Sequence, residues 1–304
     1  MKIPSLISRR RFLQLAGAAA VLPRVLRAES AAWPGIGISI FGANTWEEGL
    51  RDIAAIGYKN VEVHLGPGPT DPTVLLPPGR REFRRMLDSL GLKISGFTTH
   101  TTSLLDDGPA LAQNLDAIKA AAQMGHNLDP GTRPHLQIQS NGVSEEWGPN
   151  RAKLLDRFGL FADTATAAGA TLAVKAHAGN AVDTPQKLLW ILQHASHRAL
   201  SANYDYSHFE FTGISLAESL AMLLPYTTFL QVKDARMEGG RRHYLLPGEG
   251  DIDYAEYFRL LRRRRYTGPV VVEISAHVKV RPGFDFKTCA QSSFTAVDSG
   301  RRQA

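Results

Sequence analysis

The stretch LPGEGDIDYAEYFRLLRRRRYTGPVVVEIS, residues 246–275, contains in order a glycine-containing loop, an amphipathic segment and a short apolar run. Asp253 followed by Glu256 is the pattern of a capping box, which marks the start of a helix. The residues after it place leucines and aromatics at helical spacing, so the arginine run 262–265 is interpreted as a solvated helix face. The apolar run 269–275 is a strand candidate. The stretch therefore predicts a helix followed by a strand.

The same alternation of apolar runs and amphipathic segments extends along the chain from about residue 35. Further helix starts are indicated at Thr45, Thr184 and Ser215, each a capping residue followed by an acid or a proline. The strand candidates are the runs 35–42, 60–66, 92–100, 135–142, 171–179, 200–209, 228–234 and 269–275. Eight strand–helix units predict a single (β/α)8 barrel, the TIM barrel of the α/β class, at residues 33–298.

A doubly wound open sheet is the alternative fold. It would normally carry a glycine-rich phosphate loop after the first strand, and FGANTW, residues 41–46, matches such a loop poorly. We therefore favour the barrel.

The first 28 residues have the features of a cleavable export signal. SRRRFLQ, residues 8–14, carries paired arginines before a short apolar segment, as twin-arginine leaders do. That segment is too short to span a bilayer as a permanent helix, and LRA, residues 26–28, is a usable cleavage site. We expect residues 1–28 to be removed and the protein to be periplasmic or secreted, without stable membrane insertion after cleavage. The alternative is an N-terminal anchor that stays attached.

The charge balance argues against a nucleic-acid partner. The chain has 35 basic and 29 acidic residues, a net charge of +6. Six of the basic residues and none of the acids lie in the leader, which leaves 29 of each sign in the remainder. The basic excess therefore belongs to the leader and predicts no nucleic-acid surface. The single cysteine, Cys289, cannot form an internal disulfide and is expected to be a packed structural residue.

Polar and charged side chains recur at the C-terminal ends of the predicted strands, where a TIM barrel forms its active site. They are Glu62, His64, His100, Gln139, Asn141, Lys175, His177, Asp205, His208, Gln231, Lys233, Asp234 and Glu273. Side chains alternate along a strand with period two, so Lys175 and His177 are expected to share a face. One such residue would be an ordinary structural group, whereas a ring of them predicts a functional pocket.

Three segments resemble a known family. NYDYSH, residues 203–208, resembles its D-x-x-H signature, QVKDA, residues 231–235, resembles its H-V-K-D segment, and the stretch 246–275 resembles its ending. The family is the xylose-isomerase-like TIM barrel superfamily, the sugar phosphate isomerase/epimerase group. The matches lie in order over residues 170–275, and the N-terminal half agrees in barrel periodicity and in GYKNVE, residues 57–62.

The resemblance implies one divalent metal, Mn, Zn, Co or Mg, held by a glutamate, an aspartate, a histidine and a glutamate on strands five to eight. At those positions this chain has Lys175, Asp205, Gln231 and Glu273, so only Asp205 and Glu273 keep the ligand type. An ammonium has no lone pair and cannot ligate a metal. We therefore predict that a Lys175–Asp205–Glu273 ion cluster replaces the metal.

A shifted metal site is the rival interpretation. His177, His208, Asp205 and Glu273 are ordinary nitrogen and oxygen ligands, and His243 in the following loop could join them. The residues alone leave the choice between the two interpretations open.

The resemblance implies an exported enzyme of the sugar isomerase/epimerase type, acting on a small-molecule carbohydrate or sugar acid by proton transfer next to a carbonyl. By resemblance, Glu273 is the expected base and His208 the expected acid or hydroxyl contact. Lys175 could stabilise an oxyanion in place of the metal, or act as a base if its pKa is low. Further expected substrate contacts are His177, Gln231 and Lys233.

The segment from Asp234 to Asp253 is long for a loop and predicts a lid. Arg236 and His243 in it are expected to contact an anionic group of the substrate, and Glu249 is expected to contact substrate or to cap a turn. Two other functions remain open: a lyase or hydrolase acting on a keto-sugar, and a carbohydrate-binding barrel that has lost catalysis with its metal site.

Overall fold

The structure, a computed structural model, describes residues 33–304, so the predicted export signal lies outside the described residues. Eight parallel strands close into a barrel, and each successive strand pairs with the next around the ring. The barrel strands are β1 (Ile36–Ser39), β2 (Asn60–Leu65), β3 (Lys93–Thr99), β4 (His135–Gln139), β5 (Thr171–Lys175), β6 (Leu200–Tyr204), β7 (Thr227–Val232) and β10 (Val270–Val272). All eight strand candidates and the TIM barrel are confirmed.

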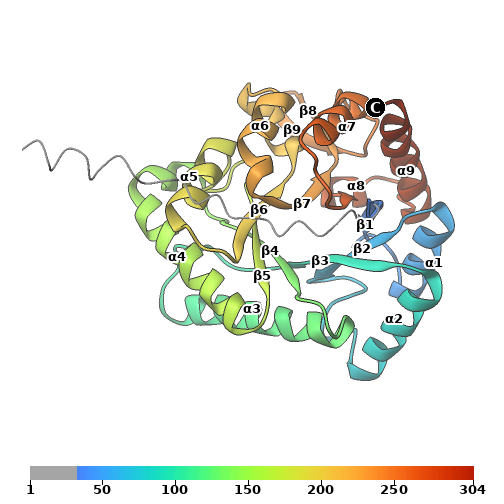
Figure 1. The fold of residues 1–304 in the computed structure, drawn as a ribbon, viewed down its shortest axis with the longest axis horizontal. Helices are drawn as coiled ribbons and strands as arrows, with labels where there is room; N and C mark the ends of the chain where they lie inside the picture. The colour runs from blue at the N-terminus through green and yellow to red at the C-terminus, as the bar shows by residue number, and fades with distance from the viewer. Residues whose placement is uncertain (1–32) are drawn as a thin grey trace, which may run out of the picture. The chain divides into compact units, whose positions relative to one another are not determined.

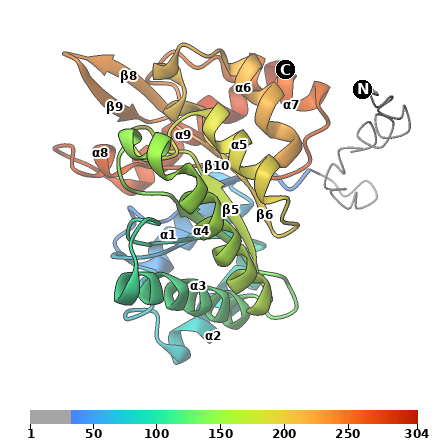
Figure 2. The ribbon, with the colours of Figure 1, turned by 90° about the vertical axis from the view of Figure 1, so that its left-hand side faces the viewer.

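Helices surround these strands (Figures 1 and 2). They are α1 (Trp46–Ile56), α2 (Pro77–Leu90), α3 (Gly108–Leu128), α4 (Trp147–Ala167), α5 (Pro185–Ala195), α6 (Leu216–Leu223), α7 (Tyr254–Arg263), α8 (Ala276–Lys279) and α9 (Phe286–Gln303). The predicted caps are present: the side chain of Thr45 accepts from Glu48 N at 3.2 Å, and Ser215 and Glu218 cap each other reciprocally. Each cap satisfies backbone N–H groups that the first helical turn leaves unpaired. None of the helices in residues 33–304 combines the length and apolar character needed to cross a membrane.

The predicted lid segment contains a β-hairpin, which the sequence did not predict. Strands β8 (Asp234–Glu238) and β9 (Arg241–Leu245) pair antiparallel and project from the barrel (Figure 2). Gly239 and Gly240 form the turn, with φ of 57° and 75°. A two-residue turn of this hand requires left-handed backbone at both positions, which glycine adopts without steric cost. The two glycines are therefore the turn of a regular hairpin.

A small apolar cluster inside the barrel lies directly below the polar side chains of the barrel mouth. Ala173 of β5, Phe229 of β7 and Val271 of β10 form a small buried cluster separate from the main core. Because strand side chains alternate, the residues two positions further along the same strands point the same way. Those residues are Lys175, Gln231 and Glu273, and they form the next layer toward the C-terminal mouth. The inward-facing side chains of these strands thus change from apolar to polar over two residues.

Candidate active site

Lys175 lies at the centre of an ion cluster. Its Nζ is 2.7 Å from Asp205 Oδ2 and 2.5 Å from Glu273 Oε2, and it donates to Gln231 Oε1 at 2.9 Å. The structure therefore brings together the three residues that we expected to replace the metal. All three N–H groups of the ammonium have acceptors.

A second ammonium completes the cluster. Lys233 Nζ is 2.5 Å from Asp205 Oδ2, 3.1 Å from Glu273 Oε2 and 3.1 Å from His208 Nε2. The Lys233 side chain is only 1% exposed, so it cannot be the open substrate contact that we expected. Two cations and two anions make the buried cluster formally neutral, which offsets much of the cost of removing the charges from water.

The cluster shifts the pKa values of its members. Burial raises the pKa of Glu273, but the attraction of Lys175 and Lys233 outweighs it and leaves that pKa below its usual range. Burial lowers the pKa of Lys175, but Asp205 and Glu273 outweigh it and leave that pKa raised. Lys175 is therefore a stable cation and Glu273 a stable anion near neutral pH, and neither is suited to act as a base.

Tyr244 of β9 covers the outer side of the cluster. Its hydroxyl lies 2.8 Å from His208 Nδ1, and Lys233 Nζ is 5.1 Å from the centre of its ring. His208 is fully buried, and its pKa is lowered by burial and by Lys233. The ring of His177 packs against His208 with centroids 4.1 Å apart. This side of the mouth is closed, and Asp205, His208 and Lys233 do not line the cavity described next.

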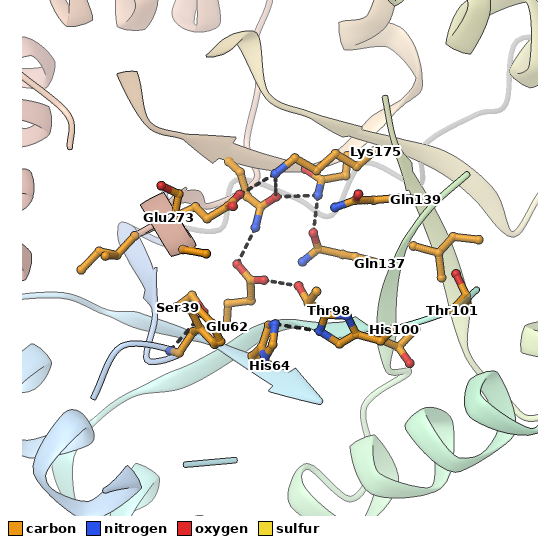
Figure 3. A pocket seen from close by; sticks show the side chains of 18 of the residues that line it. Ser39, Glu62, His64, Thr98, His100, Thr101, Gln137, Gln139, Lys175 and Glu273 are labelled. Carbon is orange, nitrogen blue, oxygen red and sulfur yellow. Dashed lines mark hydrogen bonds and ion pairs between the residues drawn. The ribbon is translucent and has the colours of Figure 1, made fainter. Parts of the chain in front are cut away.

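A cavity of about 480 Å³ opens on the other side of the mouth. Figure 3 shows Lys175 and Glu273 on one side of it, with Glu62 and His64 facing them. Its walls also contain Ser39, Thr98, Thr101, Gln137, Gln139 and Asn141. Most of these residues come from β1 to β4 and the loops after them, so the half of the chain whose only family-like segment is GYKNVE, residues 57–62, supplies most of the cavity.

Glu62 is the titratable group of this wall. Its carboxyl accepts from Gln231 Nε2 at 2.8 Å and from the hydroxyl of Thr98. Burial raises the pKa of Glu62 to about 7, the hydrogen bonds from Thr98 and Gln231 oppose that rise, and Glu273 adds to it. We placed Glu62 in the ring of strand-end residues without giving it a role. The pattern of β2, where Glu62 and His64 share a face, was the signal that could have identified it.

His64 and His100 form a pair on the same wall. Their Nε2 atoms are 2.9 Å apart, and burial lowers the pKa of His64 to about 4 and also lowers that of His100. Both rings are therefore neutral at pH 7, with one donating and the other accepting.

The remaining expected contacts lie away from the cavity. Arg236 and His243 are exposed on the hairpin. Glu249 pairs with Arg281 at 2.9 Å and accepts from Leu246 N, so it stabilises a turn. Asp234 accepts from Gly248 N and Gly250 N at 2.8 Å and orders the same loop.

The donor set at the expected metal position does not fit a divalent ion. Lys175 takes the place of one ligand, and its Nζ and that of Lys233 both contact Asp205 Oδ2. A metal at that oxygen would have to displace two cations.

The structure does not assemble the shifted metal site either. Both ring nitrogens of His208 have partners, and His243 is exposed on the hairpin. Within residues 33–304, no three His, Cys, Asp or Glu side chains form a group that could hold a metal ion.

The comparison with known families agrees with this barrel. A family profile described as "Xylose isomerase-like TIM barrel" matches residues 50–288, most of the chain. The chain belongs to this family. The resemblance that residues 203–208, 231–235 and 246–275 suggested is thereby confirmed.

The proteins to which this chain is similar carry names that indicate several activities. An inosose dehydratase of Clostridium perfringens is 23% identical over 252 residues, which cover 76% of this chain and 82% of the relative. A xylose isomerase-like TIM barrel/4-hydroxyphenylpyruvate dioxygenase fusion protein has a TM-score of 0.72 at 21% identity, and the match covers 90% of this chain but 44% of the fusion. A D-psicose 3-epimerase of Clostridium cellulolyticum, solved with D-tagatose, has a TM-score of 0.68 at 16% identity over 88% of this chain and 98% of its own. The two structural matches show the shared fold.

Proposed function

We propose that the protein is an enzyme of the isomerase, epimerase or dehydratase type that moves the proton next to a carbonyl group of a sugar or cyclitol. One observation carries the proposal: the amide of Gln231 lies between Lys175 and Glu62. Its oxygen accepts from the Lys175 ammonium at 2.9 Å, and its nitrogen donates to the Glu62 carboxyl at 2.8 Å. The cation and the carboxyl are therefore spaced for the two ends of one O=C–N–H group.

A ketone with an adjacent hydrogen, O=C–C–H, has nearly the same length as that amide. Bound on the cavity side of Gln231, it would present its carbonyl oxygen to Lys175 and its C–H to Glu62. The carbonyl oxygen would replace the Gln231 oxygen as an acceptor, because a neutral amide is a weaker partner for the ammonium than the two carboxylates. Lys175 would then stabilise the negative charge that develops on the oxygen.

Glu62 suits the role of acid and base. With a pKa of about 7, both its protonated and its ionised form are populated near neutral pH, so it can accept a proton and return it. Glu273, the base expected from the family resemblance, is held ionised by two ammonium groups. We therefore transfer the role of base to Glu62.

The cavity also suits a ligand with several hydroxyl groups. Gln137 Nε2, Asn203 Oδ1 and His64 Nδ1 are buried polar atoms on lining residues, and none of them has a hydrogen-bond partner within the protein. An unpaired buried polar atom costs free energy, which a hydroxyl-bearing ligand would recover. The names of the similar proteins, an inosose dehydratase and a D-psicose 3-epimerase, support this substrate class.

The test is exchange of the substrate C–H with solvent deuterium, followed by NMR over a panel of ketoses and inososes. We expect exchange with the wild type and its loss in Glu62→Gln, with binding retained. Glu210→Gln is the matched control, because Glu210 also has a raised pKa, about 8, but does not line the cavity. Exchange that persists in Glu62→Gln would exclude Glu62 as the base. Loss of water from the substrate would distinguish a dehydratase from an epimerase.

A carbohydrate-binding protein without catalysis is the second candidate. It is favoured by one observation, that all three protons of Lys175 are already engaged. Tight binding of a keto-sugar with no exchange would establish it.

We also propose that the enzyme acts in the periplasm or outside the cell, on the basis of SRRRFLQ, residues 8–14. N-terminal sequencing of the protein from a periplasmic fraction tests this, and a chain that begins at Met1 would contradict it.

A further inference from the structure

Lys279 is a cation on the cavity wall that lacks a carboxylate partner. Its Nζ donates to the backbone oxygen of Phe41 at 3.3 Å and lies 4.2 Å from the centre of the Phe41 ring. Within residues 33–304, no Asp or Glu oxygen lies within ion-pair distance of it. Lys175 and Glu273, which line the same cavity, are paired with each other at 2.5 Å.

The charge around the cavity is therefore positive when Glu62 is protonated and balanced when Glu62 is ionised, although no ion pair joins Glu62 to Lys279 within residues 33–304. Lys175 and Lys233 balance Asp205 and Glu273, and His64 and His100 are neutral near pH 7. Lys279 remains as one uncompensated positive charge, half-buried at the cavity wall. A ligand with one negative charge would neutralise it.

From this geometry we infer that the substrate carries a carboxylate, that Lys279 binds this carboxylate, and that the substrate class is therefore a keto-sugar acid. The inference rests on the proposed function, since it assigns the ligand of the same cavity. A carboxylate matches a single unpaired ammonium in charge, whereas a phosphate dianion would leave a negative charge without a partner. The half-buried position strengthens the pairing, because the charges are less screened there than at the open surface.

Lys279 also lies next to the rest of the binding wall. The ring of Phe41, which it contacts, packs against His64 with centroids 4.5 Å apart. A carboxylate at Lys279 would therefore lie at the edge of the wall that contains Glu62 and His64, where it would orient the remainder of the sugar toward Glu62. Lys279 is in this sense a specificity-determining residue.

The experiment compares two six-carbon keto compounds, 5-keto-D-gluconate and D-fructose, by isothermal titration calorimetry. We expect the wild type to bind the carboxylate compound at least about tenfold more tightly, as a charge-assisted hydrogen bond in a partly buried site allows. In Lys279→Gln the preference should fall to about twofold or less, with the affinity for D-fructose unchanged. Lys93→Gln is the matched control, because it removes the same charge from an exposed lysine at the opposite end of the barrel and should keep the wild-type preference.

Equal affinity of the wild type for both compounds, no binding of either, or an unchanged preference in Lys279→Gln would overturn the inference. Its failure is distinguishable from failure of the proposed function. Deuterium exchange of a neutral keto-sugar, without any preference for the acid, would support the proposed catalysis and contradict the proposed role of Lys279. A preference for the acid that depends on Lys279, without any deuterium exchange, would support the keto-sugar acid as ligand and contradict the proposed catalysis.

Discussion

The two walls of the barrel mouth differ in how their charged groups are paired. On the wall formed by β5, β6, β7 and β10, Lys175 and Lys233 each have three partners, and Tyr244 covers the cluster. On the wall formed by β1 to β4, Glu62 forms no ion pair within residues 33–304 and has a pKa of about 7. Unpaired buried atoms lie on both walls, on Gln137 and His64 of this one and on Asn203 and Ser275 of the other. A fully paired ion cluster stabilises one arrangement, whereas a buried carboxyl without an ionic partner can change its protonation state near neutral pH.

Most of the segments that resemble the family lie on the closed wall, away from the residues that line most of the cavity. The closed wall contains the segments that resemble the family most specifically, residues 203–208 and 231–235, and the open wall contains only GYKNVE, residues 57–62. In this chain these motifs therefore mark the position of an ion cluster, and the free cavity lies beside it, with Lys175 and Glu273 lining its wall. Four predictions test this contrast, in order of decreasing effect.

Restoring the ligand types that the family resemblance implies should create a metal site in the closed wall. In Lys175→Glu combined with Gln231→His, two oxygen ligands and a histidine would join Asp205 and replace one ammonium. We expect the wild type to be purified with no stoichiometric metal and the double variant to bind one Mn²⁺ by isothermal titration. Metal analysis that finds one equivalent in the wild type, lost in Asp205→Asn, would contradict the ion-cluster interpretation.

Removing one charge from the cluster should destabilise the fold strongly. Lys233→Met leaves a buried carboxylate short of a partner, and we expect the free energy of unfolding in urea to fall by about 3–5 kcal/mol. Combining it with Asp205→Asn should cost less than the sum of the two single changes, because the remaining Lys175 and Glu273 balance each other. Arg85→Ala is the control, since it breaks an exposed pair at 3.9 Å and should cost at most about 0.5 kcal/mol. A loss below about 1 kcal/mol in Lys233→Met would show that the cluster is not fully closed.

On the open wall, Glu62→Gln should change how stability depends on pH. The folded pKa of Glu62 is about 7 against 4.5 for the unfolded chain, so the folded state holds this proton more tightly. The stability from this group is present below pH 4.5 and is lost as pH rises through 7. Above pH 7 we therefore expect Glu62→Gln to be more stable than the wild type, by at most about 3 kcal/mol.

Urea unfolding of both proteins between pH 4 and pH 9 measures this difference. A difference that does not vary with pH would mean that the pKa of Glu62 is unshifted. Glu210→Gln again provides the comparison with a raised pKa outside the cavity.

A change at Tyr244, which covers the closed wall, should have the smallest effect on stability. Tyr244→Phe removes the hydroxyl 2.8 Å from His208 Nδ1, which keeps its contact with Ala178 N at 3.3 Å. We expect a loss of about 1 kcal/mol in the free energy of unfolding. The affinity for a keto-sugar should not change, because Tyr244 does not line the cavity. A tenfold or greater fall in that affinity, about 1.4 kcal/mol, would place Tyr244 within the ligand site.

The barrel and the Lys175 cluster could be predicted from the sequence for a physical reason. Buried parallel strands are apolar runs that stand out between amphipathic helices, and family motifs gave Lys175, Asp205 and Glu273 their positions. The hairpin could not be predicted in this way. Its exposed residues are mostly polar and lack an apolar alternation, and only Gly239 and Gly240 indicated a turn.

The site was less predictable than the fold, because the chemistry of each side chain depends on the residues that contact it in three dimensions. Lys233 looked like a substrate contact, and only the three-dimensional structure shows that Asp205, Glu273 and His208 use its three protons. Glu62 ends GYKNVE, residues 57–62, but that resemblance implied no role for it, and its raised pKa comes from burial, which one strand's sequence does not reveal. In both cases the neighbours that decide the chemistry are distant along the chain.

The hairpin has a consequence for comparing family members. Its twelve residues, Asp234–Leu245, begin directly after Lys233 and return Tyr244 to the same lysine, so one segment supplies both the extension and the side chain that covers Lys233. A family member with a much shorter segment there would leave the equivalent lysine facing water. The length of this segment can be read from any sequence, and it distinguishes homologues with a sealed lysine from those in which the amine is free to react.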